Sequence, residues 1–210
     1  MTTRFCFVRH GETAWNTVRR IQGHLDLPLN ANGIAQARAL AGNLRTETFA
    51  ALYSSDLERA RHTAEAVGHV LRLPVRLLPA LRERHFGVFQ GLTFDECARS
   101  HPAEHARMRA REPDYAMPGG ESLAAFRQRA LEAVADLARR HAGVQVLVVT
   151  HGGVLDMLYR RATAQPLEAP RKCELPNAAL NWIEVAGEDW TLLAWADRSH
   201  LVAALDELPG

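Results

Sequence analysis

Two short segments near the start of the chain hold side chains that together could bind a phosphate group. Arg9, His10 and Gly11 directly follow the apolar run of residues 5–8, and Arg59 comes much later. A strand that ends in Arg-His places a guanidinium and an imidazole at the carboxyl edge of a sheet, where open α/β sheets bind ligands. The glycine allows a sharp backbone turn at that edge. These segments predict one anion pocket.

Apolar strand-like runs alternate with amphipathic helices along the chain, which predicts an α/β fold. The segments are residues 4–8 (strand), 31–44 (helix), 50–53 (strand), 57–71 (helix), 123–138 (helix), 144–149 (strand), and 179–185 with 191–196 (a hairpin added to the sheet). We expect Asn30 or Asn32 to cap the first long helix, and we expect Ile34 on its buried stripe.

The start of the second long helix bears on the pocket. Ser55 and Glu58 form an S-x-x-E pattern, which predicts a capping box that opens this helix. Arg59 then lies in the first turn, where free backbone N–H groups and partial positive charge favour an anion. The sequence therefore predicts a phosphate near Arg59.

Composition is ordinary for a globular protein and excludes several classes. The 210 residues can bury one substantial core, so we expect one domain over residues 1–210. They are 47% hydrophobic and 23% charged, with a formal net charge of +1. Nucleic acids and anionic membranes favour strongly basic faces. We therefore expect neither as a partner, and any anion binding must be local.

Cysteine usage and hydropathy favour a soluble cytoplasmic protein. Cys6, Cys97 and Cys173 are odd in number and far apart, without metal-ligand spacing, as expected for reduced thiols. No uncharged apolar stretch reaches the roughly 18 residues that span a bilayer. Arg9 and His10 interrupt the first apolar run too early for a signal peptide.

The segment from Thr93 to Pro118 differs from the rest of the chain. It mixes acidic residues with six basic or imidazole side chains and shows no strand pattern; these are Arg99, His101, His105, Arg107, Arg109 and Arg111. We interpret residues 92–120, approximately, as a small helical insertion or lid. Its arginines could hold an anionic substrate, and a solvated helix of mixed charge is the alternative.

Several motifs follow one another in an order that goes beyond a single Arg-His-Gly match. They are Arg9-His10-Gly11-Glu12, Gln22-Gly23, Ser54-Ser55-Asp56-Leu57-Glu58-Arg59-Ala60, Leu81-Arg82-Glu83, Pro118-Gly119-Gly120-Glu121-Ser122, His151-Gly152-Gly153 and Leu175-Pro176-Asn177-Ala178. In this order, and over nearly the whole chain, they resemble the histidine phosphatase superfamily, which includes cofactor-dependent phosphoglycerate mutases. The resemblance implies a three-layer α/β/α sandwich with a mostly parallel central sheet.

The resemblance also implies roles for five side chains. His10 matches the histidine that accepts the phosphoryl group as a covalent phosphohistidine. Arg9 and Arg59 match the arginines that bind the phosphate oxygens, and His151 matches a histidine that stabilises the charge of the transferring group. Glu83 matches the acid that protonates the leaving alkoxide. Such phosphoryl transfer rests on positioning and charge, so we expect no metal and no cofactor.

Four further positions match residues that bind the phosphate or the substrate in this family. They are Asn16, Gln22, Gly23 and Gly152. We expect the bound partner to be a small phosphorylated metabolite or inorganic phosphate, and the sequence leaves a homodimer open.

Each role has a simpler structural alternative. His10 could cap a strand end as a partly buried histidine, and His151 could be a core histidine bonded to the backbone. Arg59 could be a solvated helix arginine paired with a neighbouring carboxylate. Glu83 lies between Arg82 and Arg84, where a surface ion pair is the alternative.

Three functions fit these residues. We favour a metal-independent phosphomonoesterase in which water discharges a phosphohistidine at His10. The first alternative is a cofactor-dependent phosphoglycerate mutase, and the second is a non-catalytic phosphate-binding regulatory module. Only 35 residues separate Glu83 from Gly119, where the mutases carry a longer insertion, and Gly152-Gly153 stands where they usually have Gly-Asn. A shorter lid leaves a phosphoenzyme more open to water, which a mutase must exclude.

Overall fold

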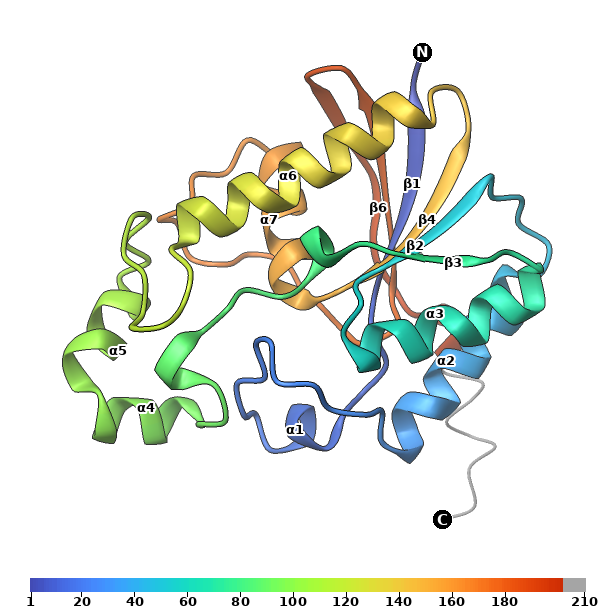
Figure 1. Ribbon diagram of the computed structural model, residues 1–210. Helices are drawn as coiled ribbons and strands as arrows, with labels where there is room; N and C mark the ends of the chain where they lie inside the picture. The colour runs from blue at the N-terminus through green and yellow to red at the C-terminus, as the bar shows by residue number, and fades with distance from the viewer. Residues whose placement is uncertain (202–210) are drawn as a thin grey trace.

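A computed structural model describes residues 1–201 as a six-stranded mixed sheet with helices on both faces (Figure 1). The strands are β1 (Thr3–Arg9), β2 (Ala51–Ser54), β3 (Val75–Leu77), β4 (Gln145–Thr150), β5 (Leu180–Ala186) and β6 (Asp189–Asp197). The helices are α1 (Ala14–Thr17), α2 (Ala31–Leu44), α3 (Glu58–Leu71), α4 (Phe94–Ser100), α5 (Pro102–Arg109), α6 (Leu123–Arg140) and α7 (Gly152–Ala162), with 3-10 turns η1 (Pro79–Leu81) and η2 (Gly87–Phe89).

The strand order is β3-β2-β4-β1-β5-β6. The first four strands are parallel, whereas β5 and β6 form an antiparallel hairpin beside β1. The predicted α/β/α sandwich, its mostly parallel sheet and the added hairpin are therefore confirmed.

Side chains of β1 alternate between two hydrophobic cores. Phe5 and Phe7 belong to the core that α6 and α7 cover, whereas Cys6 and Val8 belong to the core under α2 and α3. All four are fully buried. Figure 1 shows these helix pairs on opposite sides of the sheet. A central parallel strand is buried on both faces, which explains the unbroken apolar run in the sequence.

The start of α2 confirms one prediction and corrects another. Asn30 is the cap, and its side chain accepts a hydrogen bond from the N–H of Gly33 at 2.7 Å. Ile34 is 44% exposed, so its expected place on the buried stripe was wrong. At this end of the helix Gly33 faces inward instead, because its backbone packs directly against that of Glu12.

The predicted capping box at α3 is also wrong. The helix begins at Glu58 with Leu57 as its N-cap residue, which has no polar side chain to cap it, and the N–H of Glu58 instead donates to Oδ1 of Asp26 at 2.6 Å. The Ser55 hydroxyl lies 2.8 Å from Nε2 of His151 and accepts a long hydrogen bond, at 3.3 Å, from the N–H of Leu57. The contact of Ser55 with His151, which is far away in sequence, thus replaces the predicted capping bond. Arg59 lies in the first turn as predicted.

Three neighbouring strands end at the same level. Arg9 of β1 pairs with Thr150 of β4, and Ser54 of β2 pairs with Val149 of β4. The residues that follow these strand ends are His10, Ser55 and His151. Parallel strands therefore bring side chains from three distant parts of the chain to one edge of the sheet.

The insertion contains α4 and α5, which lie beyond the carboxyl end of β1 in Figure 1. A small separate core of Ile21, Phe89, Cys97 and Met117 supports it. The segment is therefore helical, as predicted, and packs against the loop that follows α1.

We predict that Gly33→Ala destabilises the protein. A Cβ at residue 33 would lie 2.0 Å from the carbonyl oxygen of Glu12, so the backbone must shift, and overpacking of this kind costs about 1–3 kcal/mol. The matched control is Gly42→Ala in the same helix, where a Cβ meets nothing within 4 Å and should add roughly 0.5–1 kcal/mol of stability. Urea unfolding followed by circular dichroism measures both, and equal stabilities would contradict the prediction.

Candidate active site

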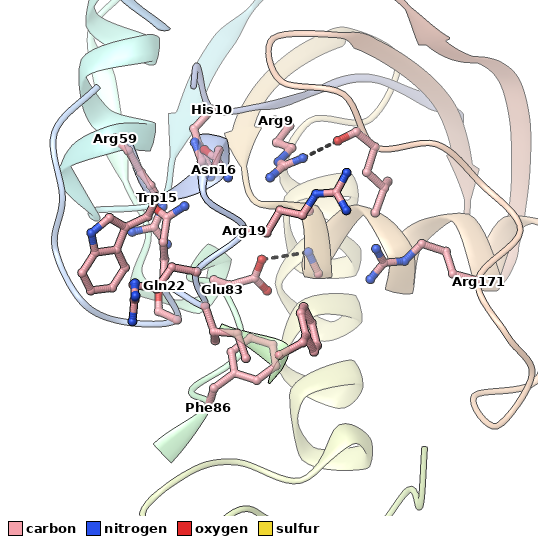
Figure 2. A pocket seen from close by; sticks show the side chains of 17 residues that line it. Arg9, His10, Trp15, Asn16, Arg19, Gln22, Arg59, Glu83, Phe86 and Arg171 are labelled. Carbon is pink, nitrogen blue, oxygen red and sulfur yellow. Dashed lines mark hydrogen bonds between the residues drawn. The ribbon is translucent and has the colours of Figure 1, made fainter. Parts of the chain in front are cut away.

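A cavity of about 460 Å³ lies at this edge of the sheet. Five arginines and one glutamate supply its charged lining, namely Arg9, Arg19, Arg20, Arg59, Arg171 and Glu83. Figure 2 shows Arg9, Arg19 and Arg171 along one side and His10, Asn16 and Arg59 along another. The local charge is thus strongly positive, although the chain carries a net charge of only +1.

His10 lines the cavity and is 3% exposed. Its Nδ1 lies 2.7 Å from the carbonyl oxygen of Gly11. Because a carbonyl only accepts hydrogen bonds, this contact places the proton on Nδ1 and leaves a lone pair on Nε2. Burial, with the positive charges of Arg59 and Arg9, holds the pKa of His10 well below its ordinary value of 6.5. The imidazole is therefore neutral and nucleophilic at pH 7.

Arg59 is 1% exposed and is held by main-chain carbonyls. Its Nη1 donates to Leu25 at 2.9 Å, and its Nη2 donates to Gly23 at 2.8 Å. Burial lowers its pKa to about 10, so it stays cationic at neutral pH. The alternative of a solvated helix arginine is wrong.

Arg9 is held in the same way, because its Nη1 donates to the carbonyl of Leu175. Burial lowers the pKa of this side chain too. Among the described residues, neither Nε of Arg9 nor Nε of Arg59 has a hydrogen-bond partner, although both atoms are buried. Buried donors are normally satisfied, so two such groups at one cavity point to an anionic ligand.

His151 is fully buried and does not itself line the cavity. Its ring centroid lies 5.2 Å from that of His10. Ser55 holds Nε2, while no described residue bonds the buried Nδ1. Burial, with the charge of Arg59, holds the pKa of His151 well below 6.5. The partner is a side chain and not the backbone, so the alternative of a backbone-bonded core histidine is wrong.

Glu83 projects into the cavity from the segment between η1 and η2 (Figure 2). Its Oε2 accepts a hydrogen bond from the N–H of Gly153 at 2.9 Å, and its Oε1 accepts one from the N–H of Arg84 at 2.8 Å. A Cβ at residue 153 would lie 2.0 Å from Oε1, so the carboxylate occupies space that only glycine leaves. Arg82 pairs with Asp56, at 2.6 Å, so the predicted alternative of a surface ion pair for Glu83 is wrong.

The four remaining predicted positions also line the cavity. The Oδ1 atom of Asn16 accepts from Thr13 in a capping box, which leaves the amide NH₂ for a ligand. Gln22 is 8% exposed. Gly23 carries the carbonyl that holds Arg59, and Gly152 begins α7 directly after His151.

Several lining residues were not predicted. The aromatic ones are Trp15, Phe86 and Phe94, and the basic ones are Arg19, Arg20 and Arg171. Ser55, which bonds His151, was assigned to a helix cap instead. Arg19 and Arg20 follow Asn16 closely, and Arg171 shortly precedes the Leu175-Pro176-Asn177 motif. This proximity to motifs was the signal in the sequence that could have indicated these arginines as lining residues.

These groups provide the elements of phosphoryl transfer. A neutral imidazole offers a nucleophilic nitrogen, two guanidinium groups can hold phosphate oxygens, and a carboxyl group stands near for proton transfer. Within residues 1–201, no three His, Cys, Asp or Glu side chains are grouped so that they could hold a metal ion.

Comparison with known proteins defines the class first. The chain matches the histidine phosphatase superfamily (branch 1) over residues 5–198. It is 40% identical over 202 residues to a metal-independent phosphoserine phosphatase of Arabidopsis thaliana, covering 95% of this chain and 83% of that protein. It is 33% identical over 207 residues to a probable phosphoglycerate mutase GpmB of Photorhabdus laumondii, covering 96% of each.

A solved structure agrees with these relatives. Bacillus stearothermophilus YhfR superposes with a TM-score of 0.88 at 36% identity, covering 95% of this chain and 99% of that one. The chain belongs to the histidine phosphatase superfamily and has its phosphoglycerate mutase-like fold.

We predict that the imidazoles of His10 and His151 are neutral at pH 6.5, where free histidine is half protonated. The reason is that burial and the nearby arginines disfavour the cation in both rings. Imidazole ¹⁵N chemical shifts measure protonation, with free histidine in the same buffer as the control. Half-protonation of either ring at pH 6.5, or a proton on Nε2 of neutral His10, would contradict this.

Proposed function

We propose that the protein is a metal-independent phosphomonoesterase that transfers the phosphoryl group of a small phosphate ester to His10 and then to water. The observation that carries the proposal is the placement of His10. Gly11 fixes its tautomer, and the buried arginines Arg9 and Arg59 line the same cavity. The named activity of the Arabidopsis relative supports the same conclusion.

In the first step, Nε2 of His10 attacks phosphorus and the bond from phosphorus to the ester oxygen breaks. Arg9 and Arg59 bind the equatorial oxygens, where negative charge is concentrated. His151 lies 5.2 Å from His10 between ring centroids; with the Ser55 hydroxyl donating to its Nε2, the proton is on the unpartnered Nδ1, which donates to a phosphate oxygen. Glu83, in its acid form, gives its proton to the leaving alkoxide.

In the second step, water attacks the phosphohistidine. The Glu83 carboxylate accepts a proton from this water, the bond between nitrogen and phosphorus breaks, and inorganic phosphate leaves. The hydrogen bonds from Gly153 and Arg84 hold the carboxylate in place for both transfers. His10 and Glu83 return to their starting protonation states, so the cycle balances.

Gly153 supports hydrolysis over mutase chemistry. The mutases usually have asparagine at this position, and here any side chain would displace the Glu83 carboxylate. The mutase remains the alternative, because relatives with that name match the chain along its length. Rapid isomerisation of 3-phosphoglycerate in the presence of 2,3-bisphosphoglycerate, with little free phosphate, would favour it.

The cysteines and the hydropathy of the helices bear on the compartment in which we expect the protein. The three cysteines are unpaired, which supports a reducing compartment such as the cytoplasm. In the part of the chain that the structure describes, no helix combines the length and apolar character needed to cross a bilayer. The single domain over residues 1–210, the lid role of residues 92–120 and a homodimer remain predictions.

We predict that His10→Ala abolishes the acid-labile phosphoenzyme and reduces phosphate release from 4-nitrophenyl phosphate by at least about 10³-fold, because the nucleophile is lost. The matched control is His62→Ala, on the outer part of α3, which should behave as wild type. Release is measured with a chelator present throughout. Complete dependence on a divalent ion, or full activity of His10→Ala, would overturn the proposal.

We predict that Glu83→Gln slows esters of poor leaving groups more than aryl esters. An alkoxide needs a proton as it leaves, whereas 4-nitrophenolate does not. The measurement is kcat/KM for glycerol 3-phosphate and for 4-nitrophenyl phosphate, and we expect the ratio to fall by about 10²-fold. Glu132→Gln on the exposed face of α6 is the control. Equal slowing of both esters by Glu83→Gln would exclude the acid role.

A further inference from the structure

A second cavity of about 440 Å³ adjoins the first. The two share Glu83, Phe86, Phe94, Gly153 and Arg171 as lining residues. Glu83 therefore stands at their boundary. Because this carboxyl group serves the oxygen of the leaving alcohol in the proposed function, the rest of that alcohol has room to extend into the second cavity.

One carboxylate in the wall of this second cavity forms ion pairs with three arginines. Asp156 of α7 is 2% exposed, and its oxygens lie 3.2 Å from Nε of Arg160, 3.3 Å from Nη2 of Arg111 and 3.6 Å from Nε of Arg171. A single negative charge thus faces three positive ones. The cluster keeps a surplus of positive charge, which favours a further anion.

Two of the three arginines are also fastened to the segment after α7. Arg160 donates to the carbonyls of Pro166 and Ala169, and Arg111 donates to that of Leu167 at 2.7 Å. These bonds give both guanidinium groups a structural role. They also hold the segment from which Arg171 extends.

Arg171 differs from its two neighbours. Its side chain is 50% exposed, and its Nε forms an ion pair with Asp156 at 3.6 Å, which is longer than a hydrogen bond. No described residue bonds its Nη1 or Nη2. Figure 2 shows it at the side of the cavity that holds Glu83 and Arg19. A guanidinium with an ion-pair partner near Nε and two open terminal nitrogens presents the fork that binds a carboxylate with two hydrogen bonds.

We propose that Arg171, held by Asp156, binds a carboxylate on the leaving alcohol and so selects phosphate esters of hydroxy acids. This inference rests on the proposed function, because it assigns the leaving group of that reaction. Arg171 is thus a specificity-determining residue of the cavity. Glu168 lines the second cavity too, but among the described residues it forms no ion pair with Arg171 that would replace the substrate.

The main alternative is a purely structural cluster that only fastens the segment of residues 163–171. In that case Arg171 would affect stability or all substrates alike. A carboxylate-binding role instead changes the preference between two esters that differ only in the carboxylate. The pair 3-phosphoglycerate and glycerol 3-phosphate differs in this way, with a carboxylate in one and a hydroxymethyl group in the other.

The experiment measures kcat/KM for both esters with wild type, Arg171→Met and the control Lys172→Met. Methionine keeps the length of the side chain and removes the charge, and Lys172 is an exposed neighbour that lines neither cavity. We expect wild type to prefer 3-phosphoglycerate. In Arg171→Met the ratio should fall by about 10- to 100-fold, as for the loss of charge-assisted hydrogen bonds, and in Lys172→Met it should stay unchanged.

Hydrolysis of 4-nitrophenyl phosphate by wild type is measured in parallel. It distinguishes a failure of the carboxylate role of Arg171 from a failure of the proposed phosphatase function. If this ester is hydrolysed but wild type shows no preference, or Arg171→Met slows both alkyl esters equally, the carboxylate role of Arg171 is wrong and the phosphatase assignment stands. If none of the three esters releases phosphate, the proposed function fails and the inference fails with it.

Discussion

The site depends on keeping two arginines charged inside the protein. Burying a cation is costly unless polar groups replace its water. For Arg9 and Arg59 those groups are main-chain carbonyls of Gly23, Leu25 and Leu175, which are neutral. Among the described residues no carboxylate forms an ion pair with either guanidinium, although Glu83 attracts both through space. Burial, and after it the positive charge of these arginines, lowers the pKa of both adjacent imidazoles, so one buried cluster gives both an anion pocket and neutral imidazoles.

Those bonds also determine the shape of the surrounding loops. The residues around Gly23 are held by Arg59 on one side and by Gln90, just before the insertion, on the other, since the N–H of His24 donates to Gln90 at 2.7 Å. Arg20 pairs with Glu96 of α4, also at 2.7 Å. The loop of residues 20–24 and the first helix of the insertion are consequently one connected unit. The second cavity lies against α5 and the segment after α7, where Arg111 and Arg171 supply most of the contacts with Asp156.

The sequence predicted the features that depend on short-range pattern. Buried parallel strands have unbroken apolar runs, and the Arg-His and His-Gly exits mark their ends, so Arg9, His10 and His151 could be placed at one edge of the sheet in advance. The roles of these residues, and the choice of Glu83, came from the family resemblance. The errors at Ser55 and Ile34 share a cause, because each local pattern yielded to a contact made across the fold. Arg171 could not be assigned, because its significance comes from Asp156 and from a cavity formed by segments far apart in sequence.

The backbone contact between α2 and the end of β1 affects how variants should be interpreted. A Cβ on Gly11 would lie 2.5 Å from the carbonyl oxygen of Gly33, so the helix rests on the peptide whose own carbonyl orients the His10 ring. A small displacement of α2 therefore reaches the His10 ring without passing through any side chain that lines the cavity. A variant in α2 can therefore have reduced turnover even though the altered residue does not contact the substrate.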